Sequence, residues 1–192
     1  MVKYYAGIGS RSTPYEVCRT FIKVGYILGN EGIVLRSGDA QGADTAFRKG
    51  CDYAGGNKEI YIPWKGFNGS NDGIVVDKHS PIYAEARRIA ECYHPAWDRL
   101  SDAGRELMVR NSFQILGEDL RTLSNFVMCW TEKGKLKGGT AQAIRIAQDF
   151  NIPVLNVGSI PMTEMQKEII KFLDNLHIIS EEKLLEYFQQ EK

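Results

Sequence analysis

The sequence predicts an α/β fold with a mostly parallel central sheet, helices on both faces and further helices at the C-terminal end. Short apolar segments alternate with longer segments of helical periodicity, a pattern typical of parallel sheets covered by helices. A glycine-rich turn follows three of the apolar segments, and each of these turns leads into a helical pattern. In such folds ligands bind beyond the carboxyl ends of the strands, where we expect the three turns to lie.

The apolar segments give the expected strands of the sheet. They cover residues 3–8, 33–36, 59–63, 125–130 and 153–157. The segment at 125–130 is apolar almost throughout, which is typical of a strand in the centre of a sheet, where both faces are covered.

Capping residues mark most of the expected helix starts. These residues are Thr13, Ser101, Thr163 and Ser180; a further helix opens at Ser80-Pro81, and another is expected over residues 141–150. Pro14 stands at the first position of the first helix, where proline is favoured. We therefore expect one domain over residues 1–160. A helical extension over residues 161–192 would pack on that domain or on a partner subunit.

Composition excludes several classes of protein. The chain has 192 residues with 24 basic and 24 acidic side chains, so a protein that coats nucleic acid is not expected. No apolar run reaches the roughly 18 residues of a membrane span, and no secretory pattern opens the chain, so we expect a cytoplasmic protein. The four cysteines lack the spacing of a zinc site or disulfide framework and are expected to be free thiols. We expect no metal and no cofactor.

The turn after the second apolar segment is the strongest candidate for a binding site. Ser37, Gly38 and Gly42 lead into a helix start that carries Asp44. Glycine lets the backbone approach a ligand closely, and the free N–H groups of a helix start favour an anion. Asp44 could cap the helix or accept a hydrogen bond from a ribose hydroxyl. The alternative is a tight turn with a purely structural cap.

Two other turns have the same character. The first contains Gly9, Ser10 and Arg11, but Ser12 replaces the third glycine of the dinucleotide fingerprint, so a standard NAD site is not supported. The third contains Gly138, Gly139 and Thr140, and three lysines precede it: Lys133, Lys135 and Lys137. Lysines before a helix N-terminus suit an anionic ligand.

For a few polar and aromatic residues, the sequence leaves open whether they bind a ligand or have a structural role. Arg110 and Asn111 are adjacent polar residues within an apolar helical pattern, and Arg binds phosphate through its planar set of donors. A surface position is the alternative for this pair. Trp64 and Phe67 could stack on a base, although covering the edge of the sheet is favoured. His94 lies beside a proline, and a structural role is favoured for it.

Taken in order, four elements resemble the SLOG superfamily. They are the turn at residues 7–11, the S-G-x-A-x-G-x-D element at 37–44, the pair Arg110–Asn111 and the turn at 138–140. This superfamily joins the DNA-processing protein A domain to the Lonely Guy phosphoribohydrolases. The resemblance covers residues 2–157 approximately. The chain's small size is similar to that of stand-alone SLOG proteins of phages and bacteria, which would place it in a host cytoplasm if it is phage-encoded.

The resemblance implies a Rossmann-like three-layer sandwich that binds a nucleotide or nucleotide-derived ligand. By matched position, it implies ligand contacts from these residues: Gly9, Ser10, Arg11, Ser37, Gly38, Gly42, Asp44, Arg110, Asn111, Gly138, Gly139 and Thr140. The chain departs from the hydrolases, which carry P-G-G-x-G-T-x-x-E with a catalytic Glu. Here Lys137 replaces the Pro, the fourth-position Gly and its following Thr are compressed to Gly139–Thr140, and Ala143 stands in the place of the Glu.

Three hypotheses of function follow, in order of preference. The first is a sensor or sequestering protein for a small nucleotide, such as an ADP-ribose-like or signalling nucleotide. The second is a nucleotide N-glycosidic hydrolase, for which Asp44 and Glu118 are the candidate catalytic carboxylates. The third is a single-stranded DNA-binding protein, which the zero net charge disfavours. A second copy of the chain is a further candidate partner, and no membrane is expected.

Overall fold

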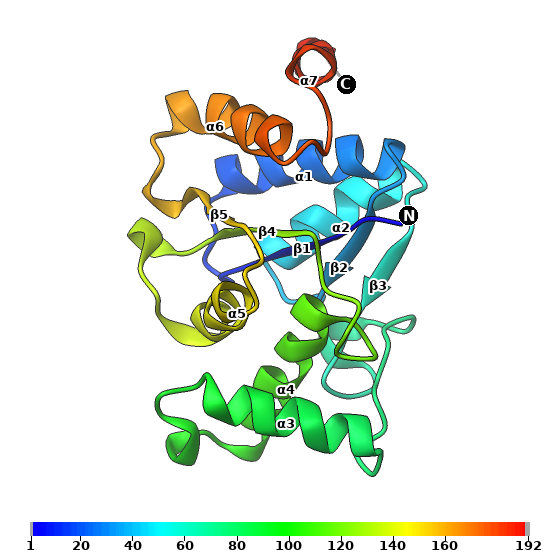
Figure 1. Ribbon diagram of the computed structural model, residues 1–192, viewed down its shortest axis with the longest axis vertical. Coiled ribbons are helices and arrows are strands. Elements are labelled where there is room, and N and C mark those ends of the chain that lie inside the picture. Colours follow the sequence, from blue (N-terminus) through cyan, green and yellow to red (C-terminus); the bar gives the residue numbers. More distant parts are fainter. Residues whose placement is uncertain (1, 191–192) are drawn as a thin grey trace.

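The computed structural model describes residues 2–190 and contains a five-stranded, all-parallel sheet (Figure 1). The strands are β1 (Tyr4–Gly9), β2 (Val34–Ser37), β3 (Lys58–Ile60), β4 (Phe126–Trp130) and β5 (Val154–Asn156). Helices cover both faces, so the predicted α/β class and the Rossmann-like three-layer sandwich are confirmed.

The strand order β3-β2-β1-β4-β5 creates a switch point beside β1. The chain first builds the sheet outward from β1 to β2 and β3. It then returns to the other side of β1 to add β4 and β5. At such a switch point the two connections leave β1 and β4 in opposite directions, which opens a crevice at the carboxyl ends of these strands.

The helices form two layers that pack on opposite faces of the sheet (Figure 1). One layer contains α1 (Tyr15–Asn30), α2 (Ala43–Tyr53) and α6 (Met162–Asn175), and the other contains α3 (Pro81–Cys92), α4 (Asp102–Leu116) and α5 (Gly138–Asp149). Strand β4 serves both layers, because Phe126, Met128 and Trp130 join the core of the first and Val127 and Cys129 that of the second. This double burial explains its continuous apolar sequence.

The C-terminal helices pack on this same chain. Met165, Ile169 and Leu173 of α6 are buried in the core that contains Phe126. Helix α7 (Glu181–Gln189) lies outside α6 and α1 and buries Leu184. Among residues 2–190, no helix combines the length and the apolar character that crossing a membrane requires.

The predicted helix start at Ser80 and the predicted cap at Ser101 are confirmed. Ser80 accepts a hydrogen bond from the backbone N–H of Tyr83 at 3.2 Å, and Ser101 accepts one from that of Gly104 at 3.1 Å. Each satisfies one of the unpaired donors of a helix start.

The predictions for Thr13 and Thr163 are wrong. Helices α1 and α6 begin after Pro14 and Pro161, which occupy the N-cap positions and have no side-chain acceptor. The Thr13 hydroxyl instead donates to the carbonyl of Ser10 at 2.6 Å and thereby closes the turn after β1. Ser180 stands at the N-cap of α7 but its side chain makes no capping bond.

The expected start of the helix at residue 141 is also wrong. Helix α5 begins at Gly138, so the Gly-Gly-Thr segment is the first turn of the helix rather than a loop before it. Glycine suits both positions, because Gly138 has a φ of +68° and a Cβ atom on Gly139 would lie 2.9 Å from Cε of Met108. The helix N-terminus therefore lies three residues closer to the end of β4 than the sequence pattern suggests.

Candidate functional site

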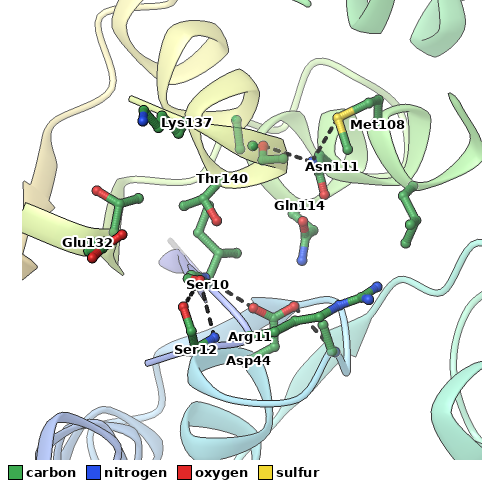
Figure 2. Close-up of a pocket in the computed structure, with 18 of the residues that line it drawn as sticks. Ser10, Arg11, Ser12, Asp44, Met108, Asn111, Gln114, Glu132, Lys137 and Thr140 are labelled. Atoms are coloured by element: carbon green, nitrogen blue, oxygen red, sulfur yellow. Dashed lines mark hydrogen bonds between the residues drawn. The ribbon is translucent and has the colours of Figure 1, made fainter. Parts of the chain in front are cut away.

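A cavity of about 520 Å³ lies at the carboxyl ends of β1 and β4, at the switch point of the sheet. Four segments line it: the turn after β1, the start of α2, the middle of α4, and the β4–α5 connection with the first turn of α5. Figure 2 shows Lys137 and Thr140 on one side of this hollow and Ser10 and Asp44 on the other, with Gln114 between them. Segments distant in sequence therefore meet where such folds bind ligands.

Most of the residues that the sequence singles out lie together in this cavity. The lining includes Gly9, Ser10, Arg11, Asp44, Arg110, Asn111, Gly138, Gly139 and Thr140. It does not include Ser37, Gly38 or Gly42. Glu118 is exposed beyond the end of α4 and also lies outside the lining, so it is not placed to act on a ligand in this cavity.

Gly38 and Gly42 lie directly behind the cavity wall, and each permits a close internal contact. A Cβ atom on Gly38 would lie 1.2 Å from Nη1 of Arg110. A Cβ atom on Gly42 would lie 2.5 Å from the carbonyl oxygen of Ser10, and Gly42 also has a φ of +87°. The hydroxyl of Ser37 is buried and donates to the carbonyl of Gly7 at 2.6 Å. These three residues thus hold the wall from behind.

Asp44 and Arg110 form a buried ion pair in the floor of the cavity. Oδ2 of Asp44 lies 3.3 Å from Nη1 of Arg110, and the residues are only 3% and 7% exposed. The two carboxylate oxygens also accept from the backbone N–H groups of Gly9, at 3.1 Å, and Ala40, at 3.4 Å. Burial raises the pKa of the Asp44 carboxyl, against the lowering effect of Arg110 and of these two N–H groups.

This pair joins the start of α2 to β1 and α4. Because Asp44 already accepts bonds from three donors, it holds the first two glycine turns together at the cavity floor. Its role as a ribose acceptor, expected from the sequence, would have to use an acceptor position that these three donors leave open.

Side-chain amides continue the polar network from Arg110 to α5. With its amide oxygen facing Arg110, Gln114 accepts from Nη1 at 2.9 Å and from the N–H of Gly38 at 2.7 Å, while its nitrogen donates to Asn111 at 3.0 Å. Nδ2 of Asn111 in turn donates to the carbonyl of Gly139 at 3.1 Å. The network therefore connects the second glycine turn to the third across α4.

The opposite wall combines a helix N-terminus with basic side chains. The first N–H groups of α5, at the Gly-Gly-Thr turn, have no partner within the helix, and the helix dipole makes this end positive. Arg11, Lys135 and Lys137 line the same cavity, and no ion pair involves them in the described part of the chain. Lys133, which the sequence grouped with these lysines, is not part of the lining.

Sequence reasoning missed Gln114 and Glu132, which both line the cavity. Gln114 follows Arg110 by one helical turn, so it shares a helix face with it, and this spacing was a usable signal. Glu132 comes two residues after the end of β4, at the edge where a parallel sheet binds its ligands. Three lysines follow Glu132 closely in the sequence, and they indicate a site for an anion, in which a carboxylate is not expected.

The other residues that the sequence left open lie elsewhere. Trp64 and Phe67 pack edge to face with ring centroids 5.3 Å apart and belong to the core on one face of the sheet. Nδ1 of His94 accepts from the N–H of Ala96 at 3.3 Å, away from the cavity. Within residues 2–190, no three His, Cys, Asp or Glu side chains gather as a metal site would require.

Comparison with solved structures shows that other proteins share this fold. No protein-family model matches the chain, and no curated protein matches its sequence. The structure of the Chlamydomonas rheinhardtii Moco carrier protein is similar to it with a TM-score of 0.50 and 16% identity, over 99% of each chain. At this identity the likeness shows a shared fold over the whole length.

Proposed function

We propose that this chain is a SLOG-type protein that binds a nucleotide or nucleotide-derived ligand in the cavity at β1 and β4. It would act in the cytoplasm as a sensor or sequestering protein, for example for an ADP-ribose-like or signalling nucleotide. The observation that carries the proposal is the meeting, in one cavity, of the turn after β1, the Asp44–Arg110 pair and the N-terminus of α5. Arg11, Lys135 and Lys137, which form no ion pair with any residue of the range 2–190, line the same space.

The basic side chains of the cavity support an anionic ligand. Nε of Arg110 is buried and has no hydrogen-bond partner among the described residues, and Arg110 lines the cavity. Because this atom is itself covered, a ligand oxygen reaches it only if the side chain shifts, so the accessible support for an anion comes from Arg11, Lys135 and Lys137. The shared fold of the Moco carrier protein, a protein named for carrying Moco, is in keeping with a role in holding a small ligand.

Hydrolysis of an N-glycosidic bond fits less well. Such hydrolysis needs a carboxylate beside the reacting carbon. Ala143 lines the cavity, at the place where the Lonely Guy hydrolases carry their catalytic Glu. The carboxylate of Asp44 is buried and forms an ion pair with the guanidinium of Arg110.

Single-stranded DNA also fits less well. Proteins that bind it stack successive bases on aromatic side chains along a basic groove. In the described part of the chain, no aromatic residue lines the cavity, and its apolar lining consists of side chains such as Ile8, Leu107 and Met108.

Calorimetric titration with a panel of mononucleotides, ADP-ribose and cyclic dinucleotides tests the proposal. We expect at least one of these ligands to bind, and Arg11→Ala and Lys137→Ala each to weaken it about tenfold, the scale of a hydrogen bond to a charged group. Lys167→Ala, an exposed lysine of α6 outside the cavity, is the matched control and should leave the affinity unchanged.

Other results would favour the alternatives. Release of free base from a bound nucleotide would make the protein a hydrolase. Binding of an oligonucleotide with a steep salt dependence, without binding of any mononucleotide, would make it a DNA-binding protein. The proposal fails if Lys137→Ala and Lys167→Ala reduce ligand affinity equally.

A further inference from the structure

Glu132 is the one carboxylate of the cavity lining that has no partner within residues 2–190. The lining contains two acidic residues, and the other, Asp44, is buried and paired with Arg110. Glu132 is exposed, and no ion pair or side-chain hydrogen bond involves it in the described part of the chain. Figure 2 shows its carboxylate across the view from Asn111, on the side of the cavity where Lys137 also lies.

The backbone beside Glu132 is held firmly. The preceding residue, Thr131, is buried, and its N–H donates to Oδ1 of Asn156 at 3.1 Å while its hydroxyl accepts from Nδ2 of Asn156 at 2.6 Å. A Cβ atom on Gly158 would lie 1.8 Å from the carbonyl oxygen of Thr131, so the turn after β5 packs directly against this segment. Glu132 therefore projects from a fixed point, as a residue that selects ligands must.

The cavity thus offers two kinds of recognition at once. Arg11, Lys135, Lys137 and the N-terminus of α5 favour one compact anionic group. Glu132 accepts hydrogen bonds only, so it favours a part of the ligand that donates them, such as a pair of neighbouring hydroxyls, and it opposes additional negative charge.

We infer that Glu132 determines the specificity of this cavity. It selects a ligand with a hydroxyl-bearing sugar and little phosphate charge over a nucleoside triphosphate and over sugars that lack the hydroxyls. This inference rests on the proposed function, because it concerns which phosphate-bearing ligand the same cavity holds. Basic residues alone favour a triphosphate over a monophosphate, so the opposite preference requires a carboxylate.

Titration of Glu132→Gln with three probes tests the inference. The probes are AMP, 2′,3′-dideoxy-AMP and ATP. The unmodified protein should bind AMP at least fivefold more tightly than dideoxy-AMP. In Glu132→Gln, which keeps the side-chain shape but removes the charge, this preference should shrink to less than twofold, and the affinity for ATP should rise severalfold. Glu91→Gln, an exposed residue of α3 outside the cavity, is the matched control and should reproduce the unmodified protein.

The remaining outcomes are distinguishable. If the unmodified protein binds AMP but Glu132→Gln keeps the same preference for AMP over dideoxy-AMP, the role of Glu132 is overturned and the proposed function stands. The role of Glu132 is likewise overturned, and the proposed function stands, if the affinity of Glu132→Gln for ATP does not rise. If the unmodified protein binds none of the three probes nor any ligand of the wider panel, the proposed function and this inference fall together.

Discussion

Replacing Gly38 with alanine is expected to destabilise the protein by about 3 kcal/mol, near the lower end of the cost of breaking a buried ion pair. The added Cβ atom would lie 1.2 Å from Nη1 and 2.3 Å from Cζ of Arg110, so the guanidinium has to move away. Displacement separates it from Asp44, which is left as a buried carboxylate with only backbone donors. Urea unfolding followed by circular dichroism measures the loss.

A second glycine substitution provides the control for this effect. Gly104 lies in the first turn of α4, where a Cβ atom would come no closer than 3.3 Å to the Ser101 hydroxyl. Gly104→Ala should stay within about 1 kcal/mol of the parent stability, because alanine also restricts the unfolded chain. Equal losses from the two substitutions would contradict the role that we assign to Gly38.

The behaviour of Gly38 shows what could be predicted from the sequence and what could not. Its position in a turn at the carboxyl edge of a parallel sheet follows from the pattern of apolar segments and was predicted correctly. The sequence interpretation was that a ligand approaches the backbone there. In the structure the close neighbour is Arg110, which is 72 positions further along the chain. The local sequence indicates that a small residue is required at this position. It does not identify the side chain that packs against that residue.

For the candidate site, too, the sequence predicts the location at the edge of the sheet but not all of the residues that meet there. Parallel strands bring their carboxyl ends to one edge, so three glycine turns that follow strands had to meet. Arg110, Asn111 and Gln114 reach the same place from the middle of α4, and only tertiary packing determines which face of that helix points to the cavity. The position of Glu132 depends on the contact between Thr131 and Asn156, which a single sequence does not reveal.

The helix starts illustrate the opposite case, in which local patterns misled. Thr13 and Thr163 fit the capping box, yet a neighbouring proline takes the N-cap position in both helices. The hydroxyl of Thr13 closes the turn after β1 instead, where it supports the wall of the cavity. A residue suited to capping is equally suited to other backbone bonds, and the tertiary structure decides between them.

Removal of the Arg110 side chain is the change with the largest expected cost. Arg110→Ala leaves Asp44 buried without its cation and should destabilise the protein by about 3–5 kcal/mol. The variant should also acquire a distinctive dependence on pH. Burial already raises the pKa of Asp44, and without the opposing attraction of Arg110 its pKa in the folded state should rise further.

The sign of this pH dependence follows from proton binding. An aspartate in the unfolded chain has a pKa of about 3.9, so above about pH 4 the folded variant binds more protons than the unfolded one. The stability of Arg110→Ala should therefore fall as the pH rises from about 4, until the pH passes the raised pKa of Asp44 in the folded state. Unfolding in urea at a series of pH values between 4 and 8 measures this slope.

A second substitution in the same background identifies the group responsible. Asp44→Asn removes the buried charge, so the double variant Asp44→Asn/Arg110→Ala should lose the pH slope and be more stable at pH 8 than Arg110→Ala alone. If Arg110→Ala is as stable at pH 8 as at pH 5, or if Asp44→Asn leaves its slope unchanged, Asp44 does not depend on Arg110 for its charge. The ion pair would then not be the element that holds the floor of the cavity together.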